Sequence, residues 1–408
     1  MKCRHCYAEL KLRFIDLETA PPSNSYLTAE QLAAPEKWYP LRVFTCTNCW
    51  LVQTEDYAHF ADLFSSDYAY FSSFSSSWLA HAERYVARIV DRFGLGPESR
   101  VIEVASNDGY LLQYVRGRGI PCLGIEPTHS TAQSARDKGL EVIEEFFGRA
   151  LGEKLAQTGR AADLTAANNV LAHVPDINDF VAGFAQVLKP AGVATFEFPH
   201  LARLVADCQF DTIYHEHFSY LSLSAVRKIF AANGLSVFDV EEIETHGGSL
   251  RVYAQRSDTG TRDTSAAVAE LLAREATLGV CTDGYYLGFQ SRADRIKDDL
   301  LSFLIEAKRG GRSVGAYGAA AKGNTLLNYA GVRSSLLPWV VDRNPAKQGK
   351  FLPGSRIPIV DEDHLRRCKP SYVLILPWNL RTEVMAQIAY VREWGAEFVT
   401  AIPEIVVR

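Results

Sequence analysis

Short apolar runs alternate with amphipathic stretches along most of the chain from residue 100 onward. Runs typical of buried strands include "RVIEVAS", "PCLGIEP", "ADLTAANNV" and "GVATFEFP", and the stretches between them, such as "GYLLQYVRGRG" and "INDFVAGFAQVLKP", have helical periodicity. An amphipathic helix at about Ser77–Phe93 precedes them, and a helix at about Ser224–Ala232 and two strands, "SVFDVEEI" and "GSLRVYAQ", follow. This alternation predicts a doubly wound, mostly parallel α/β sheet.

A polar break at Asp258–Asp263 separates this domain from a second one. Helical patterns follow around Thr264–Glu275 and Leu287–Lys308, and a second strand–helix alternation runs through "RSVGAYGAAAKGNTLLNYAG", "PWVVDRNP", "SYVLILPWN" and "EFVTAIP". We therefore expect two α/β domains, over residues 81–257 and 258–408, after an N-terminal module over residues 1–80.

Composition and charge narrow the class of partner. The 408 residues have a net charge of −5, and basic residues are scattered among acids, so no nucleic-acid partner is expected. No apolar run approaches the length that spans a bilayer, and the start, "MKCRHCYAEL", lacks the apolar stretch of a secretory signal. We expect a cytoplasmic enzyme without a membrane partner. We also expect a monomer, because a three-domain chain can enclose its own active site.

The eight cysteines divide into two groups. Four are isolated and are expected to pack as small apolar residues: Cys122, Cys208, Cys281 and Cys368. The other four form two CxxC pairs, Cys3 with Cys6 and Cys46 with Cys49. Two such pairs fill the four positions of a tetrahedral zinc ion, whereas the alternative, redox dithiols, lacks a thioredoxin-like context. A closed four-cysteine site leaves no open position, so this zinc is expected to be structural.

The first candidate binding loop is "VIEVASNDGYLL". It has Glu103 inside a strand, and Ser106, Asn107, Asp108 and Gly109 in the turn to a helix.

Glu126 ends the next strand, at a distance that suits the two hydroxyls of an adenosine ribose. Because Ala105 and Ser106 replace the glycines that admit a pyrophosphate, S-adenosylmethionine suits the loop better than NAD. "AANNVLAHVPD" adds Asn168 and Asn169 at a further strand end, along the expected methionine part. The alternative is an α/β domain that binds no nucleotide.

The second candidate loop, "GAYGAAAKGNTLLN", follows a strand and opens a helix. Small residues and free N–H groups at a helix start favour an anion, and Lys322 adds a positive charge. No Ser or Thr follows this lysine, so the loop is not a P-loop. A nucleotide diphosphate, a dinucleotide or merely a tight turn remain as interpretations. The candidate ligand-binding residues are Tyr317, Ala320, Lys322, Asn324 and Asp342.

A third cluster, "YHEH" at residues 214–217, indicates an acid/base site, a metal site or a crowded loop. In an extended segment His215 and His217 would share one face, with Tyr214 and Glu216 on the other, unless the segment turns. No HExxH spacing or third ligand supports a metal. A neutral imidazole is a competent base near pH 7, and a neighbouring carboxylate would raise its basicity.

Taken together, these motifs resemble the S-adenosylmethionine-dependent C-methyltransferases of deoxysugar biosynthesis, which act on nucleotide-linked 4-keto sugars. The resemblance covers essentially the whole chain and rests on the CxxC pairs, "SSDYAYFSS", "EVASNDGYLL", "NNVLAHVPD", "FEFPH", "YHEHFSYLS", "THGGSLRVY", "GAAAKGNTLLN" and "GKFLPGSRIPI". It implies a zinc-binding domain over residues 1–80, a class I Rossmann-like methyltransferase domain over 81–257 and a Rossmann-like α/β domain over 258–408 that helps to hold a TDP-linked sugar. Ala105 stands where relatives usually have glycine.

The resemblance also implies roles for individual residues. His217 is the candidate base that takes the C-3 proton of the sugar, and Glu216 would orient it, polarise it or contact a sugar hydroxyl. Tyr214 would lie near the keto oxygen or the base, His173 would stabilise the enolate or contact substrate, and Tyr68 would close the pocket.

Further residues are candidate sugar contacts, each with a structural alternative: Glu197, His200, His246 and Arg251. An alternative function is an NAD-dependent nucleotide-sugar epimerase or oxidoreductase that uses the C-terminal glycine loop, and a further one is a non-catalytic sugar-nucleotide-binding protein.

Overall fold

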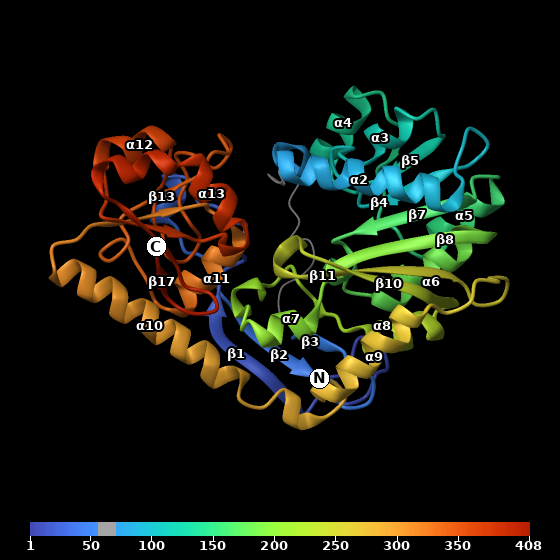
Figure 1. The fold of residues 1–408 in the computed structure, drawn as a ribbon, viewed down its shortest axis with the longest axis horizontal. Helices are drawn as coiled ribbons and strands as arrows, with labels where there is room; N and C mark the ends of the chain where they lie inside the picture. Colours follow the sequence, from blue (N-terminus) through green and yellow to red (C-terminus); the bar gives the residue numbers. More distant parts are fainter. Residues whose placement is uncertain (56–70) are drawn as a thin grey trace.

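The computed structural model describes residues 1–55 and 71–408, so the candidate Tyr68 lies outside the described residues. The described chain contains three sheets (Figure 1). The N-terminal sheet has four antiparallel strands in the order β1-β2-β3-β9: Leu12–Ala20, Tyr39–Thr45, Val52–Thr54 and Ser219–Tyr220. Its last strand therefore comes from the middle of the chain, directly after the Tyr-His-Glu-His segment.

The central sheet has seven strands in the order β10-β11-β8-β7-β4-β5-β6. Strands β4 to β8 pair in parallel, and β11 and β10 add an antiparallel edge. Their bounds are β4 Val101–Val104, β5 Cys122–Ile125, β6 Val142–Ile143, β7 Ala162–Asn168, β8 Leu188–Pro199, β10 Leu235–Ile243 and β11 Ser249–Arg256. This is the predicted doubly wound sheet, and its parallel order brings the carboxyl ends of β4, β5 and β7 to one edge.

Helices cover both faces of the central sheet. One face packs against α2 (Ser76–Phe93), α3 (Leu112–Arg116) and α4 (His129–Asp137). The other packs against α5 (Arg149–Gln157), α6 (Ile177–Val187), α8 (Leu223–Ala232) and α9 (Ala266–Leu278). Helix α2 begins where the Ser75 hydroxyl accepts a hydrogen bond from the backbone N–H of Trp78, and it ends at Gly94, whose left-handed conformation favours glycine.

The C-terminal sheet has the order β14-β13-β12-β15-β16-β17, parallel except for β17. Its strands are β12 Val314–Tyr317, β13 Val340–Val341, β14 Ile359–Val360, β15 Tyr372–Ile375, β16 Glu397–Thr400 and β17 Val406–Val407. Its helices are α10 Phe289–Arg309, α11 Ala321–Tyr329, α12 Glu362–Cys368 and α13 Arg381–Gln387. The second predicted α/β alternation is thus confirmed, and the long helix α10 runs along its outer side (Figure 1).

Short elements complete the described chain. They are η1 Glu30–Ala33, η2 Ser72–Phe74, η3 Leu171–His173, α7 Leu201–Ala206, η4 Phe210–Thr212, η5 Thr245–Gly247, η6 Asp283–Tyr285, η7 Trp378–Leu380 and η8 Ala389–Trp394. Within the described residues, no helix is both long and apolar enough to cross a membrane.

The N-terminal sheet and the C-terminal domain share one hydrophobic core. Strand β1 packs against α10, and the rings of Phe14 and Phe289 stack with their centroids 4.3 Å apart. The N-terminal module is therefore held between the other two domains, through this core and through the β3–β9 pairing.

The isolated cysteines differ in part from expectation. Cys208 is buried and Cys122 is partly buried, as small apolar residues are. Cys281 and Cys368 are exposed, so their predicted packing is wrong. Cys281 lies in the connection between α9 and α10, and Cys368 ends α12, so neither position faces a core.

Candidate active site

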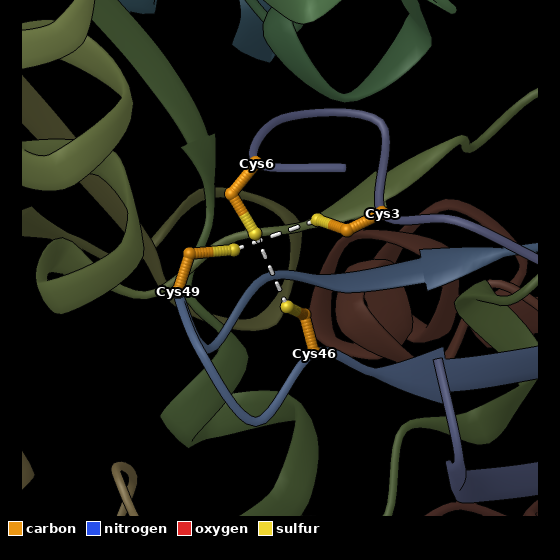
Figure 2. Close-up of side chains that lie close together, drawn as sticks. All are labelled: Cys3, Cys6, Cys46 and Cys49. Atoms are coloured by element: carbon orange, nitrogen blue, oxygen red, sulfur yellow. Dashed lines mark hydrogen bonds between the residues drawn. The ribbon is translucent and has the colours of Figure 1, made fainter. Parts of the chain in front are cut away.

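The four cysteines of the two CxxC pairs converge, with their sulfur atoms pointing toward one another (Figure 2). The sulfur-to-sulfur distances are 3.5 Å for Cys3–Cys49 and 3.5 Å for Cys6–Cys46, and all four atoms lie within 4.8 Å of one another. Tetrahedral zinc with bonds of about 2.3 Å needs sulfur atoms about 3.8 Å apart, so the set fits zinc. Hydrogen bonding from Cys49, and more weakly from Gln53, lowers the pKa of Cys3 to about 4, which favours the thiolate that binds metal.

A cavity of about 680 Å³ lies among the three parts of the chain. The N-terminal module contributes Asn24, and the C-terminal domain contributes Ala320, Ala321, Lys322 and Lys347. The remaining walls include Ser72, Trp78 on α2, the ends of β4, β5 and β7, and the segment around His217. This volume accommodates ligands of drug size, and the cavity lies at the carboxyl ends of parallel strands, where open α/β sheets bind ligands.

The loop after β4 has three residues in the left-handed region: Ala105 (φ 56°), Asn107 (φ 49°) and Gly109 (φ 77°). A side chain at Gly109 would place its Cβ atom 2.2 Å from Cδ1 of Leu140, so only glycine fits. Alanine pays about 1 kcal/mol for this conformation. Glycine would adopt the backbone conformation of Ala105 without this cost, and the loop nevertheless forms with alanine.

Four of the eight predicted cofactor residues line the cavity: Asn107, Glu126, Asn168 and Asn169. The carboxylate of Glu126 accepts hydrogen bonds from the backbone N–H groups of Asn107 (2.9 Å) and Thr128 (3.0 Å), and burial raises its pKa. Among the described residues, the Oδ1 and Nδ2 atoms of Asn168 and the Oδ1 atom of Asn169 are buried without a hydrogen-bond partner. Such unpaired polar atoms at the cavity wall fit the polar groups of a bound cofactor.

The other four predicted cofactor residues are not among the cavity-lining residues: Glu103, Ser106, Asp108 and Gly109. Glu103 is buried, and burial raises the pKa of its carboxyl group. Asp108 bonds to the hydroxyl of Ser73 and pairs with Lys138 at 3.3 Å. These residues therefore belong to the loop and its preceding strand without lining the cavity.

The Tyr-His-Glu-His segment is not extended, as a flat strand would be. It turns, because the backbone N–H of His217 bonds to the carbonyl of Tyr214 at 2.9 Å. The turn sends the two histidines apart, which is the alternative to a shared face that the sequence left open. His215 bonds to the carbonyl of Pro40 at 3.2 Å and lies against Tyr39, whereas Tyr214, Glu216 and His217 line the cavity.

One ring nitrogen of His217 donates a hydrogen bond, and the other is unprotonated. Its Nδ1–H donates to the carbonyl oxygen of Thr212 at 2.7 Å, so Nε2 holds the lone pair. Its ring lies against Tyr214, with centroids 3.9 Å apart, and against His173, 4.5 Å apart. Burial, and then the neighbouring His173, lowers the pKa of His217 well below its usual range, so the imidazole is neutral at pH 7.

His173 and Glu216 complete this wall of the cavity. Burial lowers the pKa of His173 to about 4, so its ring is neutral as well. Both carboxylate oxygens of Glu216 accept from the Asn24 amide, at 2.8 and 2.7 Å, while burial raises the pKa of Glu216 to about 7. The group that orients His217 is thus the Thr212 carbonyl rather than this carboxylate.

Three of the four predicted sugar contacts are engaged elsewhere. Glu197 and Arg251 form a buried ion pair across β8 and β11, at 2.6 Å, and Glu197 also bonds to His81 at 2.8 Å. His200 bonds to Glu275 at 2.8 Å. These three residues are not among those that line the cavity.

His246 is the exception, because it lines the cavity and its ring lies edge-on to Trp78, with centroids 5.2 Å apart. Its left-handed backbone, φ 58°, lies in the β10–β11 turn.

Of the residues predicted to bind ligand in the C-terminal loop, some line the cavity and the others do not. Ala320 and Lys322 line the cavity, and burial lowers the pKa of Lys322, whose Nζ bonds to Asn379 at 2.7 Å. Asp342 accepts from the backbone N–H groups of Ala319 and Asn344, both at 2.8 Å.

Asp342 and the remaining two predicted residues, Asn324 and Tyr317, are not among the residues that line the cavity. Asn324 donates to the carbonyl of Ser23 at 2.6 Å, and Tyr317 is buried in the core beneath α12 and α13.

Three further residues at the cavity were not predicted as site residues: Asn24, Trp78 and Lys347. Asn24 lies in an irregular segment and meets Glu216 across 192 positions, so only the tertiary fold reveals it. The signals for the other two are weak. Trp78 is one apolar residue of the predicted amphipathic helix, and Lys347 is one of several basic residues in "DRNPAKQGKFLPG".

Comparison with known proteins agrees with this geometry. Three family models match successive parts of the chain: "Putative zinc binding domain" at residues 3–64, "Methyltransferase domain" at 78–240 and "C-methyltransferase C-terminal domain" at 244–403. The chain is 34% identical to C-methyltransferase NovU of Streptomyces niveus over 403 residues, which cover 99% of this chain and 96% of NovU.

More distant similarities cover half of the chain or less. The mitochondrial ubiquinone biosynthesis O-methyltransferase of Homo sapiens is 25% identical over 153 residues, which cover 34% of this chain and 42% of that enzyme. The structure of magnesium protoporphyrin IX methyltransferase from Synechocystis PCC 6803 with bound SAH covers 50% of this chain and 90% of its own, with 16% identity and a TM-score of 0.35. The full-length match and the three domain matches are decisive: the chain belongs to the S-adenosylmethionine-dependent C-methyltransferases that have an N-terminal zinc-binding domain.

Proposed function

We propose that the enzyme methylates C-3 of a TDP-linked 4-keto-deoxysugar through an enolate, within deoxysugar biosynthesis. The observation that supports this most is the state of His217. Its imidazole is neutral, its Nδ1–H is bonded to a carbonyl so that Nε2 is unprotonated, and His217 lines a cavity that is also lined by the candidate cofactor asparagines. A buried, oriented and unprotonated imidazole is what removal of a carbon-bound proton requires.

The chemistry places definite demands on this chain. A ketone at C-4 acidifies the C–H bond at C-3, and Nε2 of His217 takes that proton while the C–H electron pair moves into the enolate. S-adenosylmethionine supplies an electrophilic methyl group on a positively charged sulfur. When C-3 attacks that methyl group, the new C–C bond uses the enolate electrons, and the electron pair of the broken S–C bond stays on sulfur as S-adenosylhomocysteine leaves.

The neighbours of His217 suit the developing negative charge on the keto oxygen. The ring of Tyr214 lies against His217, with centroids 3.9 Å apart. We assign the keto oxygen to the Tyr214 hydroxyl, because donors placed in a dry cavity stabilise an oxyanion strongly. Glu216 then contacts a hydroxyl or amino substituent of the sugar.

The nucleotide end is assigned to the C-terminal wall. Lys322, Lys347 and the start of α11 at Ala321 line the cavity together, and a positive helix start with two lysines favours phosphates. The candidate cofactor residues Asn168 and Asn169 lie in the central-domain wall of the same cavity. The NAD-dependent alternative is less well supported, since Asp342, the acid it would need, is not among the residues that line the cavity, whereas Glu126 is.

The test is mass spectrometry of a panel of TDP-4-keto-6-deoxyhexoses incubated with the enzyme in heavy water, with and without S-adenosylmethionine. Gain of one methyl mass with the donor, and deuterium uptake at C-3 without it, is the expected result. Neither methyl gain nor deuterium uptake across the panel, from enzyme that binds the nucleotides, would refute the proposal.

A further inference from the structure

Asn24 connects the N-terminal module to the cavity. Its Nδ2 atom donates to both oxygens of the Glu216 carboxylate, at 2.8 and 2.7 Å, and its backbone N–H is a second donor to the same group. Asn24 itself lines the cavity. Among the described residues these are the hydrogen bonds that hold Glu216, so one residue supplies the donors for a buried carboxylate.

Asn24 belongs to a segment that is anchored to the C-terminal domain; we name residues 23–36 the strap. The carbonyl of Ser23 accepts from Asn324 at 2.6 Å, and the Tyr26 hydroxyl donates to the carbonyl of Ala319 at 2.7 Å. Leu27 pairs with Phe351 through two backbone hydrogen bonds, of 3.0 and 2.8 Å. The strap therefore holds Asn24 against the glycine-rich loop of one domain while Asn24 bonds to the catalytic turn of another.

We propose that Asn24 is a positioning residue for Glu216: its hydrogen bonds turn the carboxylate toward the cavity and favour its ionised form, so that Glu216 presents an acceptor to the sugar. This inference rests on the proposed function, because it gives Glu216 a sugar to contact, but the hydrogen bonds between Asn24 and Glu216 do not depend on that function. An amide is suited to the task, because it donates without adding a charge of its own to a dry cavity.

The other titratable groups around Glu216 are either neutral or bonded to other residues. His173, which bonds to the backbone of Glu216, and His217 are both neutral because burial lowers their pKa values. Tyr26 on the strap is neutral because burial raises its pKa. Lys322 and Lys347 line the cavity wall from the C-terminal domain, where Lys322 donates to Asn379 at 2.7 Å and Lys347 donates to the carbonyl of Ala319 at 2.8 Å. Burial raises the pKa of Glu216 to about 7 while the Asn24 hydrogen bonds oppose that rise, so loss of the Asn24 donors should raise the pKa further.

The first test is the pH profile of C-3 deuterium uptake for Asn24→Ala and Asn24→Asp. The acidic limb, set by Glu216, is expected to move upward by roughly one to two pH units in Asn24→Ala, the worth of one charge-assisted hydrogen bond. Asn24→Asp adds a second carboxylate and moves the limb at least as far. The adjacent, exposed Ser25 provides the control, because Ser25→Ala should keep the wild-type profile. A reduced rate with an unmoved limb, or an unchanged rate, overturns the proposal.

The second test needs no activity, so it separates failure of this inference from failure of the proposed function. The melting temperatures of wild type, Asn24→Ala, Glu216→Gln and the double variant are compared at pH 5 and pH 8. The loss caused by Asn24→Ala should be larger at pH 8 than at pH 5, and this difference should vanish in the Glu216→Gln background. A loss that is equal at both pH values overturns the inference. If wild type shows no deuterium uptake, the proposed function fails, and this comparison still decides the role of Asn24.

Discussion

Replacement of Glu216 by glutamine should stabilise the free enzyme, and more so as the pH rises. Burial raises the pKa of this carboxyl to about 7 from an ordinary value of 4.5. The group is 1% exposed, so solvent screens its charge little. An acid whose folded-state pKa is raised contributes stability below its unfolded pKa, and that stability is lost as the pH rises through 4.5 to 7.

The shift sets the expected size of the effect. At 1.36 kcal/mol per pKa unit, the ionised carboxylate costs about 3 kcal/mol of folding free energy at pH 8 but only about 1 kcal/mol at pH 5. Glutamine has no charge to bury, and its carbonyl oxygen still accepts from Asn24. The variant should therefore gain about 2 kcal/mol more, relative to wild type, at pH 8 than at pH 5.

The assay is urea unfolding of both proteins at pH 5, 6, 7 and 8, followed by tryptophan fluorescence. The exposed Glu98 supplies a matched control, because Glu98→Gln should change the midpoint equally at every pH. Activity should fall in Glu216→Gln even as stability rises, since the substrate loses a charged acceptor. A stability difference that is constant from pH 5 to pH 8 would refute the reasoning.

Three further predictions follow from the site. His217→Ala should slow C-3 deuterium uptake by about 10²- to 10⁴-fold, as loss of a general base does. His215 is not among the cavity-lining residues, so His215→Ala should keep a rate within about tenfold of wild type. Equal losses in the two variants would contradict the assignment of His217 as the base. Ala105→Gly should raise stability by about 0.5–1 kcal/mol because it relieves a left-handed alanine, and a lower melting temperature would argue against that strain. Removal of zinc by a chelator should abolish both deuterium uptake and the near-ultraviolet circular dichroism of the N-terminal module. The reason is that β3 follows Cys49 closely in the chain and pairs with β9, which lies beside His217. Deuterium uptake that persists in metal-free enzyme would contradict this coupling.

The elements of the fold follow closely from the sequence. Strands such as β4, β12 and β15 are buried along their whole length, and a continuous apolar run is the pattern that parallel strands leave in a sequence. The zinc site was equally predictable, because the CxxC spacing restricts each cysteine pair to a tight turn.

The candidate site was predictable only in part. The turn at residues 214–217 contains no glycine, proline or asparagine, and it is fixed by contacts with distant residues, such as that of His215 with Pro40. Glu197 and Arg251 suggested ligand contacts as separate charged residues, but they are directly opposite each other in the β8–β11 register and neutralise each other. A charge at a strand end indicates a ligand only when the neighbouring strand does not already satisfy it, and that depends on strand pairing, which composition and periodicity do not reveal.

The most direct test of the central claim is nuclear magnetic resonance of the product formed from a TDP-4-keto-6-deoxyhexose and S-adenosylmethionine with a carbon-13 methyl group. The account predicts one labelled methyl signal with a correlation to C-3 of the sugar, formed by wild type and lost in His217→Ala. A label found on an oxygen or nitrogen atom, or on another ring carbon, would contradict it.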